Sequence, residues 1–321
     1  MLALNVNTHY QTRRYTNPSW GIIVGLVLLY QKNVFAFHYS SSSSVSTFKT
    51  TTSHVQQTFG RRSYTATSNT ALYGTPAKPM YDKVFVAGGS RGVGRAVIDR
   101  LITTQTAKHV VALIRSEEGA STLLSSPTIP REKLTIIRGD AFDYKTVENA
   151  MDGCDAAITT LGGTTALPDG SNKRIDYEGN NNVIEAAGIL GCTRLILVTS
   201  IGCGTSKEAT PPNVYQVLQD VLKAKDRAEN VLMKYYTNMN WTIIRPGGLK
   251  SEPMTGKAIL TEEATRAIGS IHREDVADLV VQALVSNKTE RKIFSAIDPS
   301  ISGAGSTPLS DAFSFQAFAL Q

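Results

Sequence analysis

Cysteine is scarce in this sequence, and no apolar run is long enough to cross a membrane. The three cysteines, Cys154, Cys192 and Cys203, are an odd number without CxxC or Cys/His spacing, so we expect neither a disulfide framework nor a metal site. Cys203 is interpreted as a small buried side chain rather than a site residue. The apolar run Trp20–Tyr30 has eleven residues, whereas a membrane-spanning helix needs about 20. We therefore expect no permanent membrane span in the mature form.

Acidic residues are absent from the first 80 positions, which hold seven Lys or Arg. The formal net charge of the whole chain is +6, but residues 81–321 hold 26 basic against 27 acidic side chains. The excess positive charge therefore belongs to the N-terminal quarter. Because the remainder is nearly neutral and has no basic stripe with interleaved aromatics, we expect no nucleic-acid partner.

The first 36 residues have the order of a secretory signal peptide. Arg13 and Arg14 precede the apolar run, and small-residue spacing at Val34 and Ala36 follows it. The sequence therefore predicts a signal peptide over residues 1–36, cleaved after Ala36.

The segment after this site is rich in hydroxyl side chains. Between Ser40 and Thr75, 18 of 36 residues are Ser or Thr, which is typical of transit peptides and predicts such a segment over residues 37–78. This bipartite order, with Phe37 directly after the cleavage site, resembles presequences of algae with complex plastids. The Ala-Pro that usually continues that pattern is replaced by His38-Tyr39. The resemblance implies the plastid stroma, with the secretory pathway, a mitochondrion or a misplaced gene start as alternatives.

From Tyr81 onward, short β-branched runs alternate with longer segments of helical period, which is typical of βαβ units and a parallel sheet. The predicted strands are Lys83–Ala87, Val110–Ile114, Leu134–Arg138, Ala156–Thr160, Leu195–Thr199, Trp241–Arg245 and Lys292–Ser295. Their apolar character indicates that helices cover both faces. The expected helices include Gly92–Ile102, Ile175–Ala187, Val214–Tyr236 and Glu274–Val285. We predict a single doubly wound α/β domain over residues 79–297, with a mostly parallel seven-stranded sheet, and a tail over residues 298–321.

A glycine-rich segment follows the first predicted strand and opens a helix. Gly88 permits a tight turn, Gly92 lets the backbone approach a pyrophosphate, and Gly94 allows the helix to pack closely on the sheet. The helix N-terminus, which includes Val93, supplies free N–H groups and partial positive charge to such an anion. In this strand–loop–helix context, the segment predicts a dinucleotide site.

The end of the second predicted strand decides which dinucleotide is preferred. An Asp or Glu there would accept a hydrogen bond from the ribose 2′-hydroxyl of NAD, but the sequence has Arg115. A guanidinium cannot accept that bond, although it can donate to a 2′-phosphate. Arg91 is a second candidate for this phosphate, and Ser90 or Ser116 offers a hydroxyl donor. We therefore expect NADP(H) to be preferred over NAD(H); the alternative is that both arginines are solvated surface residues.

The glycine spacing resembles that of the short-chain dehydrogenase/reductase superfamily, and further matches follow in order between Val84 and Ser295. The matching segments are Gly139-Asp140, Leu161-Gly162-Gly163, Asp176-Tyr177-Glu178-Gly179-Asn180, Val198-Thr199-Ser200, Arg245-Pro246-Gly247-Gly248-Leu249 and Ile271-His272-Arg273-Glu274-Asp275-Val276-Ala277. The chain is most similar to the atypical, NmrA-like and chloroplast NAD(P)-binding group, which implies a Rossmann fold. The resemblance further implies contacts of Asp140 with adenine, of Leu161 and Gly162 with a ribose, and of Pro246 and Gly247 with the nicotinamide.

The catalytic residues of the superfamily are only partly present. The resemblance implies that Ser200 is the catalytic serine and that Lys225 holds the nicotinamide ribose. Hydride-transferring members carry a Tyr one helical turn before that lysine, where it exchanges a proton with the substrate carbonyl. Here that position is Val221, which cannot transfer a proton, and Tyr215 lies nearly three turns before Lys225.

Two functions remain open. In the first, the protein is an NADPH-dependent oxidoreductase whose small-molecule acceptor, such as a quinone, flavin or enone, needs no Tyr. The acceptor would meet apolar residues that include Leu249, Pro253 and Met254, and Ser200, His272, Lys225 or water would supply the proton. In the second, NADP(H) is a sensing or structural ligand of a protein that assembles with plastid complexes, as members resembling this chain do. A nucleotide-sugar epimerase is disfavoured because it would need the Tyr and a larger C-terminal substrate domain.

Overall fold

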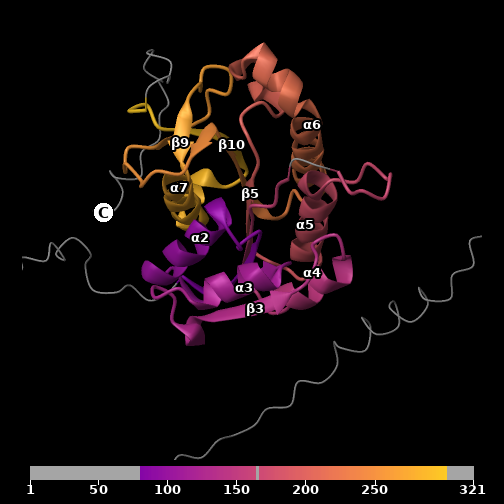
Figure 1. Cartoon of the computed structure of the whole chain (residues 1–321), viewed down its shortest axis with the longest axis vertical. Helices are drawn as coiled ribbons and strands as arrows, with labels where there is room; N and C mark the ends of the chain where they lie inside the picture. Colours follow the sequence, from indigo (N-terminus) through magenta and orange to yellow (C-terminus); the bar gives the residue numbers. More distant parts are fainter. Residues whose placement is uncertain (1–79, 164–165, 302–321) are drawn as a thin grey trace, which may run out of the picture. The chain divides into compact units, whose positions relative to one another are not determined.

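Residues 80–163 and 166–301 are described by a computed structural model of the chain (Figure 1). They form a large sheet with the strand order β3-β2-β1-β4-β5-β6-β10-β8 and a small pair of strands, β7-β9. The predicted signal peptide, the transit-peptide-like segment and residues 302–321 of the predicted tail lie outside the described residues. No helix within the described ranges is long and apolar enough to span a membrane.

Seven strands of the large sheet run parallel, and these are the seven predicted ones. They are β1 (Tyr81–Ala87), β2 (Ala107–Ile114), β3 (Leu134–Arg138), β4 (Ala156–Thr159), β5 (Arg194–Val198), β6 (Asn240–Pro246) and β10 (Lys292–Ile297). The eighth strand, β8 (Ile259–Thr261), pairs antiparallel with β10 at the edge. The predicted doubly wound α/β fold with a mostly parallel sheet is confirmed, and the edge strand is an addition to it.

Helices cover both faces of this sheet. Their bounds are α2 (Gly92–Thr103), α3 (Glu117–Leu124), α4 (Tyr144–Met151), α5 (Asn180–Ile189), α6 (Pro212–Tyr235) and α7 (Arg273–Val285). The shorter turns are η1 (Arg131–Lys133), η2 (Ile175–Gly179), η3 (Gly204–Ala209) and η4 (Asn287–Thr289). Val84 and Val86 of β1 pack with α2, α3 and α7, whereas Phe85 and Ala87 pack with α4, α5 and α6. Alternate residues of a strand thus bury opposite faces.

Local signals in the sequence explain where several helices begin and end. Ser116 caps α3 by accepting a hydrogen bond from the Gly119 N–H at 3.1 Å, and α6 begins with Pro212, whose fixed φ suits a first helical position. Gly191 follows α5 with a φ of 77°, the left-handed conformation that commonly ends a helix. The predicted helix Ile175–Ala187 begins with a π-helical turn, η2, and its remainder lies in α5 as predicted.

The strand order places the site. Strands β2 and β3 lie on one side of β1, and strands β4, β5 and β6 lie on the other. The direction in which successive strands are added to the sheet therefore reverses between β1 and β4. In open α/β sheets, ligands bind at the carboxyl ends of the strands at such a switch point. A ligand is therefore expected at the loops after β1 and β4.

Candidate functional site

The glycine loop after β1 brings α2 into direct contact with the strand ends. Gly88 has a φ of 87°, which favours glycine, and a Cβ atom on Gly94 would lie 2.4 Å from the carbonyl oxygen of Gly88. The Thr160 hydroxyl donates a hydrogen bond to the Ala87 carbonyl at 3.0 Å. Its oxygen would also lie 2.4 Å from a Cβ atom on Gly94. Only glycine at position 94 permits this approach of helix to loop.

The first turn of α2 has neither a side-chain cap nor an acidic residue. Its N-cap residue, Arg91, makes no side-chain hydrogen bond to the first-turn N–H groups, and the turn contains no acidic residue. Gly92, with a φ of 60°, and Arg91 are both exposed, and Val93 is buried beneath them. Free N–H groups and the helix dipole at this point suit a phosphate.

The first turn of α3, which follows β2, meets the glycine loop at Gly119. A Cβ atom on Gly119 would lie 2.7 Å from the Cβ of Ser90 and 3.0 Å from the Oγ of Ser116, so these two serines converge on one point. Arg115 is exposed at the end of β2. The predicted set Ser90, Ser116 and Arg115 is therefore contributed by neighbouring segments.

Sequence reasoning missed a further arginine at this edge. Arg138, the last residue of β3, forms an ion pair with Glu117 and donates to the Arg115 carbonyl at 3.4 Å. Asp140, expected at the adenine, accepts a hydrogen bond from the Phe142 N–H at 3.0 Å and so closes its own turn after β3. The sequence did contain a signal for Arg138, because it ends a predicted strand just as Arg115 ends the preceding one.

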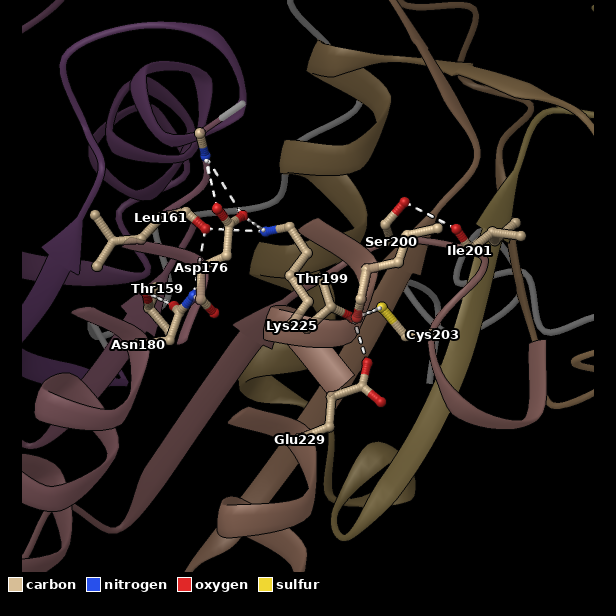
Figure 2. A network of polar contacts seen from close by, with 12 residues as sticks. Thr159, Leu161, Asp176, Asn180, Thr199, Ser200, Ile201, Cys203, Lys225 and Glu229 are labelled. Carbon is tan, nitrogen blue, oxygen red and sulfur yellow. Dashed lines mark hydrogen bonds and ion pairs between the residues drawn. The ribbon is translucent and has the colours of Figure 1, made fainter. Parts of the chain in front are cut away.

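Lys225 lies in a buried network at the end of β4 (Figure 2). Its amino group donates to the Leu161 carbonyl at 3.0 Å and pairs with Asp176 at 3.1 Å. Asp176 is fully buried and accepts a hydrogen bond from the Gly163 N–H at 3.2 Å. A Cβ atom on Gly162 would lie 3.1 Å from the same amino group. The structure thus brings together Leu161, Gly162 and Lys225, and adds Asp176.

The π-helical turn η2 fixes the position of Asp176. Asn180, at the start of α5, accepts a hydrogen bond from the Thr159 hydroxyl at 2.6 Å and donates to the Asp176 carbonyl at 2.9 Å. The end of β4 and the start of α5 are therefore tied together around the carboxylate. Such turns occur frequently at functional sites. Asp176 was recognised only as part of a motif, because nothing local in the sequence says that it faces Lys225.

Ser200 and Lys225 turn toward different partners in Figure 2. Ser200 follows β5, is half-buried, and donates its hydroxyl hydrogen to the Ile201 carbonyl at 2.9 Å. Val221 is partly buried one turn before Lys225 on α6, which is the relation expected from the sequence. Tyr215 lies in the first turn of α6, and the Lys207 amino group lies over its ring, 4.9 Å from the ring centroid.

A second buried ion pair holds α6 against the sheet. Glu229, one turn after Lys225, pairs with Arg245 of β6 at 2.6 Å and accepts a hydrogen bond from the Thr199 hydroxyl at 2.6 Å. The exposed side-chain fractions are 0% for Glu229 and 2% for Arg245. Because the pair joins α6 to the ends of β5 and β6, it sets the height of Lys225 above the sheet.

The residues after Arg245 complete the strand end. Pro246 is buried, and its carbonyl accepts a hydrogen bond from the Ile201 N–H at 2.9 Å. Gly247 donates to the Ala296 carbonyl at 2.9 Å, and a Cβ atom on Gly247 would lie 2.4 Å from the Gly269 carbonyl oxygen. β7 (Gly248–Lys250) and β9 (Ser270–His272) form the small parallel pair beside this point.

His272, Asp275 and Asp298 form a buried cluster in which one ligand-type atom of each lies within 4.8 Å of the others. We expected no metal site from the sequence, and the two carboxylates already accept hydrogen bonds. Asp275 accepts from the backbone of Thr255 and Gly256 at 3.0 and 2.9 Å. Burial raises the pKa of Asp298, but hydrogen bonds from Ser300 and Thr255 outweigh it and lower the pKa from its usual value. The cluster anchors the loop that holds Met254.

The three cysteines are buried, and all are expected to resist alkylation in the folded protein. Burial raises the pKa of Cys154 and Cys203 to about 12 and that of Cys192 to about 11. At pH 8 a thiol with a pKa near 12 is only about one part in ten thousand thiolate, the reactive form. Mass spectrometry after iodoacetamide treatment should find no adduct without denaturant and three adducts in urea. Rapid labelling of Cys203 in the folded protein would refute its placement in the core.

Comparisons with known proteins identify the family of this chain. Residues 88–287 match a family model described as NAD(P)H-binding. An uncharacterised chloroplastic protein of Arabidopsis thaliana is 31% identical over 217 residues, which cover 66% of this chain and 75% of that protein. The uncharacterised sugar epimerase YhfK of Bacillus subtilis is 29% identical over 230 residues, covering 72% and 98% respectively.

Solved structures show the same fold. The anaerobilin reductase ChuY of Escherichia coli O157:H7 superposes with a TM-score of 0.59 at 27% identity, covering 69% of this chain and 100% of that chain. The match to the family model spans the glycine loop, Lys225 and the start of α7. The chain therefore belongs to the NAD(P)H-binding family of atypical short-chain dehydrogenases/reductases.

Proposed function

We propose that this protein is an NADPH-dependent reductase that acts on an apolar acceptor. The observation that carries the proposal is the Lys225 amino group, which is 3.0 Å from the Leu161 carbonyl and 3.1 Å from Asp176 at the end of β4. Only 10% of the Lys225 side chain is exposed. A buried amino group at the switch point of the sheet is suited to donate hydrogen bonds to a ribose beside the reacting carbon.

The residues around the glycine loop fit a dinucleotide. The close approach at Gly94 holds the start of α2 against the glycine loop, and the first turn of α2 has no side-chain cap on its N–H groups. NADPH supplies a hydride when it is bound. In the proposed site, Gly88, Gly92, Val93 and Gly94 receive the pyrophosphate, Asp140 the adenine, and Leu161, Gly162, Pro246 and Gly247 the nicotinamide side.

The proposed acceptor is apolar because exposed apolar side chains lie in and after β7 and on α6. Leu249 and Met254 are 41% and 36% exposed, and Val217 on the first half of α6 is 83% exposed. Val221 continues that helix face toward Lys225. A quinone, flavin or enone suits such a surface, whereas a sugar needs polar partners. The Ser200 hydroxyl or water supplies the proton in this proposal, since Lys225 is engaged by Asp176.

The direct test uses the full chain. NADPH and NADH are titrated by fluorescence, and NADPH oxidation is then followed with quinones, enones, aldehydes and a nucleotide sugar. NADPH binding with turnover of a quinone or enone, lost in Lys225→Met, supports the reductase. Conversion of the nucleotide sugar without net NADPH oxidation would favour an epimerase, the activity that the name of the B. subtilis relative suggests.

A sensing or assembly role is the second candidate, and Val221 favours it. In catalytic members this helix position carries the Tyr that transfers a proton. The valine side chain of this chain cannot transfer one. In this case NADPH binds tightly and no acceptor is turned over. The next measurement would then be affinity capture of partners from plastids.

Plastid localisation of this chain is part of the same proposal. It is supported by the predicted bipartite presequence and by the chloroplastic relative in Arabidopsis thaliana. A fluorescent protein fused to the C-terminus should accumulate in the plastid of an alga with complex plastids. A secreted or mitochondrial fusion would contradict the proposal.

Arg115→Asp is expected to weaken NADPH binding by more than tenfold while leaving NADH binding within about twofold. The guanidinium would make a charge-assisted contact to the 2′-phosphate, which NADH lacks. The measurement is the pair of dissociation constants. Arg131→Gln, at an exposed arginine of η1, is the matched control and should change neither. Unchanged discrimination between the two cofactors would remove Arg115 from the site.

A further inference from the structure

Arg273, the first residue of α7, reaches the glycine loop at the start of α2. A Cβ atom on Gly92 would lie 3.7 Å from both the Cδ and the Nε of Arg273, an ordinary van der Waals contact. Helices α2 and α7 pack side by side on one face of the sheet (Figure 1), which brings these two distant residues together. The side chain of Arg273 therefore lies over the backbone that is prepared for a phosphate.

The same side chain also holds the segment that follows β7. An Nη1 group of Arg273 donates to the Ser251 hydroxyl at 2.7 Å. The next two residues of α7 continue this attachment: Glu274 accepts a hydrogen bond from the Met254 N–H at 3.2 Å, and Asp275 accepts from Thr255 and Gly256. The first turn of α7 thus anchors residues 251–256, the loop that carries the apolar side chains Pro253 and Met254.

We propose that Arg273 binds the pyrophosphate of NAD(P)H and holds Ser251 at the same time. A guanidinium carries five N–H donors in a planar fork, so one nitrogen can donate to Ser251 while the others face a phosphate oxygen. The absence of an acidic residue in the first turn of α2 leaves that phosphate with no nearby repulsion from this helix. This inference rests on the dinucleotide site of the proposed function. It adds a phosphate ligand that also connects the cofactor to the substrate loop.

Arg273 should not distinguish the two cofactors, and this separates it from Arg115. The pyrophosphate is common to NADPH and NADH, whereas the 2′-phosphate belongs to NADPH alone. Loss of a charge-assisted contact to the pyrophosphate therefore weakens both cofactors by the same factor. Loss of Arg115 weakens NADPH only.

The experiment measures dissociation constants of the full chain for NADPH and NADH by fluorescence, and for adenosine 2′-monophosphate by displacement of NADPH. In Arg273→Gln, both cofactors should bind about tenfold more weakly, and adenosine 2′-monophosphate, which has no pyrophosphate, should bind as before. Arg273→Lys keeps the charge without the fork and should show a smaller loss. It also provides the measurement if the Gln variant does not fold, as judged by circular dichroism.

Ser251→Ala is the control that separates phosphate binding from loop anchoring. It removes the hydrogen bond between Arg273 and the loop but leaves the guanidinium over Gly92, so both cofactor affinities should stay within about twofold. If Ser251→Ala reproduces the loss, Arg273 acts only by holding the loop and the inference is wrong. Unchanged affinities in both Arg273 variants would also overturn it. Absence of cofactor binding in the unsubstituted chain would instead refute the proposed function itself.

Discussion

Glu229→Gln is expected to lower the free energy of unfolding by about 3–5 kcal/mol, because it leaves a buried guanidinium without its counter-charge. The Glu229 carboxylate accepts hydrogen bonds from the Nε and Nη2 of Arg245 at 3.1 and 2.6 Å, and a third from the Thr199 hydroxyl. Both ionic side chains are almost completely enclosed. An amide keeps part of the shape but none of the charge. Urea unfolding followed by circular dichroism measures the difference.

Two controls decide whether burial causes this effect. Glu262→Gln breaks the surface pair of Glu262 and Lys292, whose side chains are 52% and 43% exposed, and should cost less than about 1 kcal/mol. Replacing both buried partners, as Glu229→Leu with Arg245→Met, should cost far less than the sum of the single substitutions, because no unpaired charge remains. A loss below about 1 kcal/mol for Glu229→Gln would show that Arg245 finds water or another partner.

The parallel strands could be predicted from the sequence because each contains a short apolar run, and the central strands β4 and β5 are buried along their whole length. Leu134–Arg138 was predicted with the bounds that β3 has, and the other six runs overlap their strands. β7, β8 and β9 were missed, since three residues are too few to show an alternating pattern and the three residues of β7 are all exposed. The π-helical turn before α5 was also missed, because its sequence has the same helical period as the α-helix that follows.

The site was predictable where one element determines it. The relation of Val221 to Lys225 follows from the pitch of one helix, and the glycine loop follows from one strand–helix connection. The contact of Asp176 with Lys225 and that of Arg273 with Gly92 join segments whose proximity depends on how the helices cover the sheet. Both residues were visible as members of motifs, but the partner of each became evident only in the folded chain.

Gly94→Ala is expected to weaken NADPH binding by well over tenfold and to destabilise the fold by about 1–3 kcal/mol. The added methyl group would lie 2.4 Å from the Gly88 carbonyl oxygen and 2.8 Å from its carbon, and these backbone atoms cannot rotate away as a side chain can. Helix α2 must therefore move off the end of β1, which displaces the N–H groups that face the pyrophosphate. Fluorescence titration and urea unfolding measure the two losses.

The matched control places the same methyl group where its neighbour can yield. In Gly248→Ala the nearest atom is the Ser270 hydroxyl at 3.1 Å, so stability should change by less than about 0.5 kcal/mol. Thr160→Ala combined with Gly94→Ala then identifies the constraint. Thr160 contributes the other 2.4 Å approach to the methyl group, through its hydroxyl, but removing it leaves the Gly88 carbonyl in place. Binding should therefore stay lost in the double variant, and its recovery would mean that a side chain, rather than the backbone of the glycine loop, requires glycine at this position.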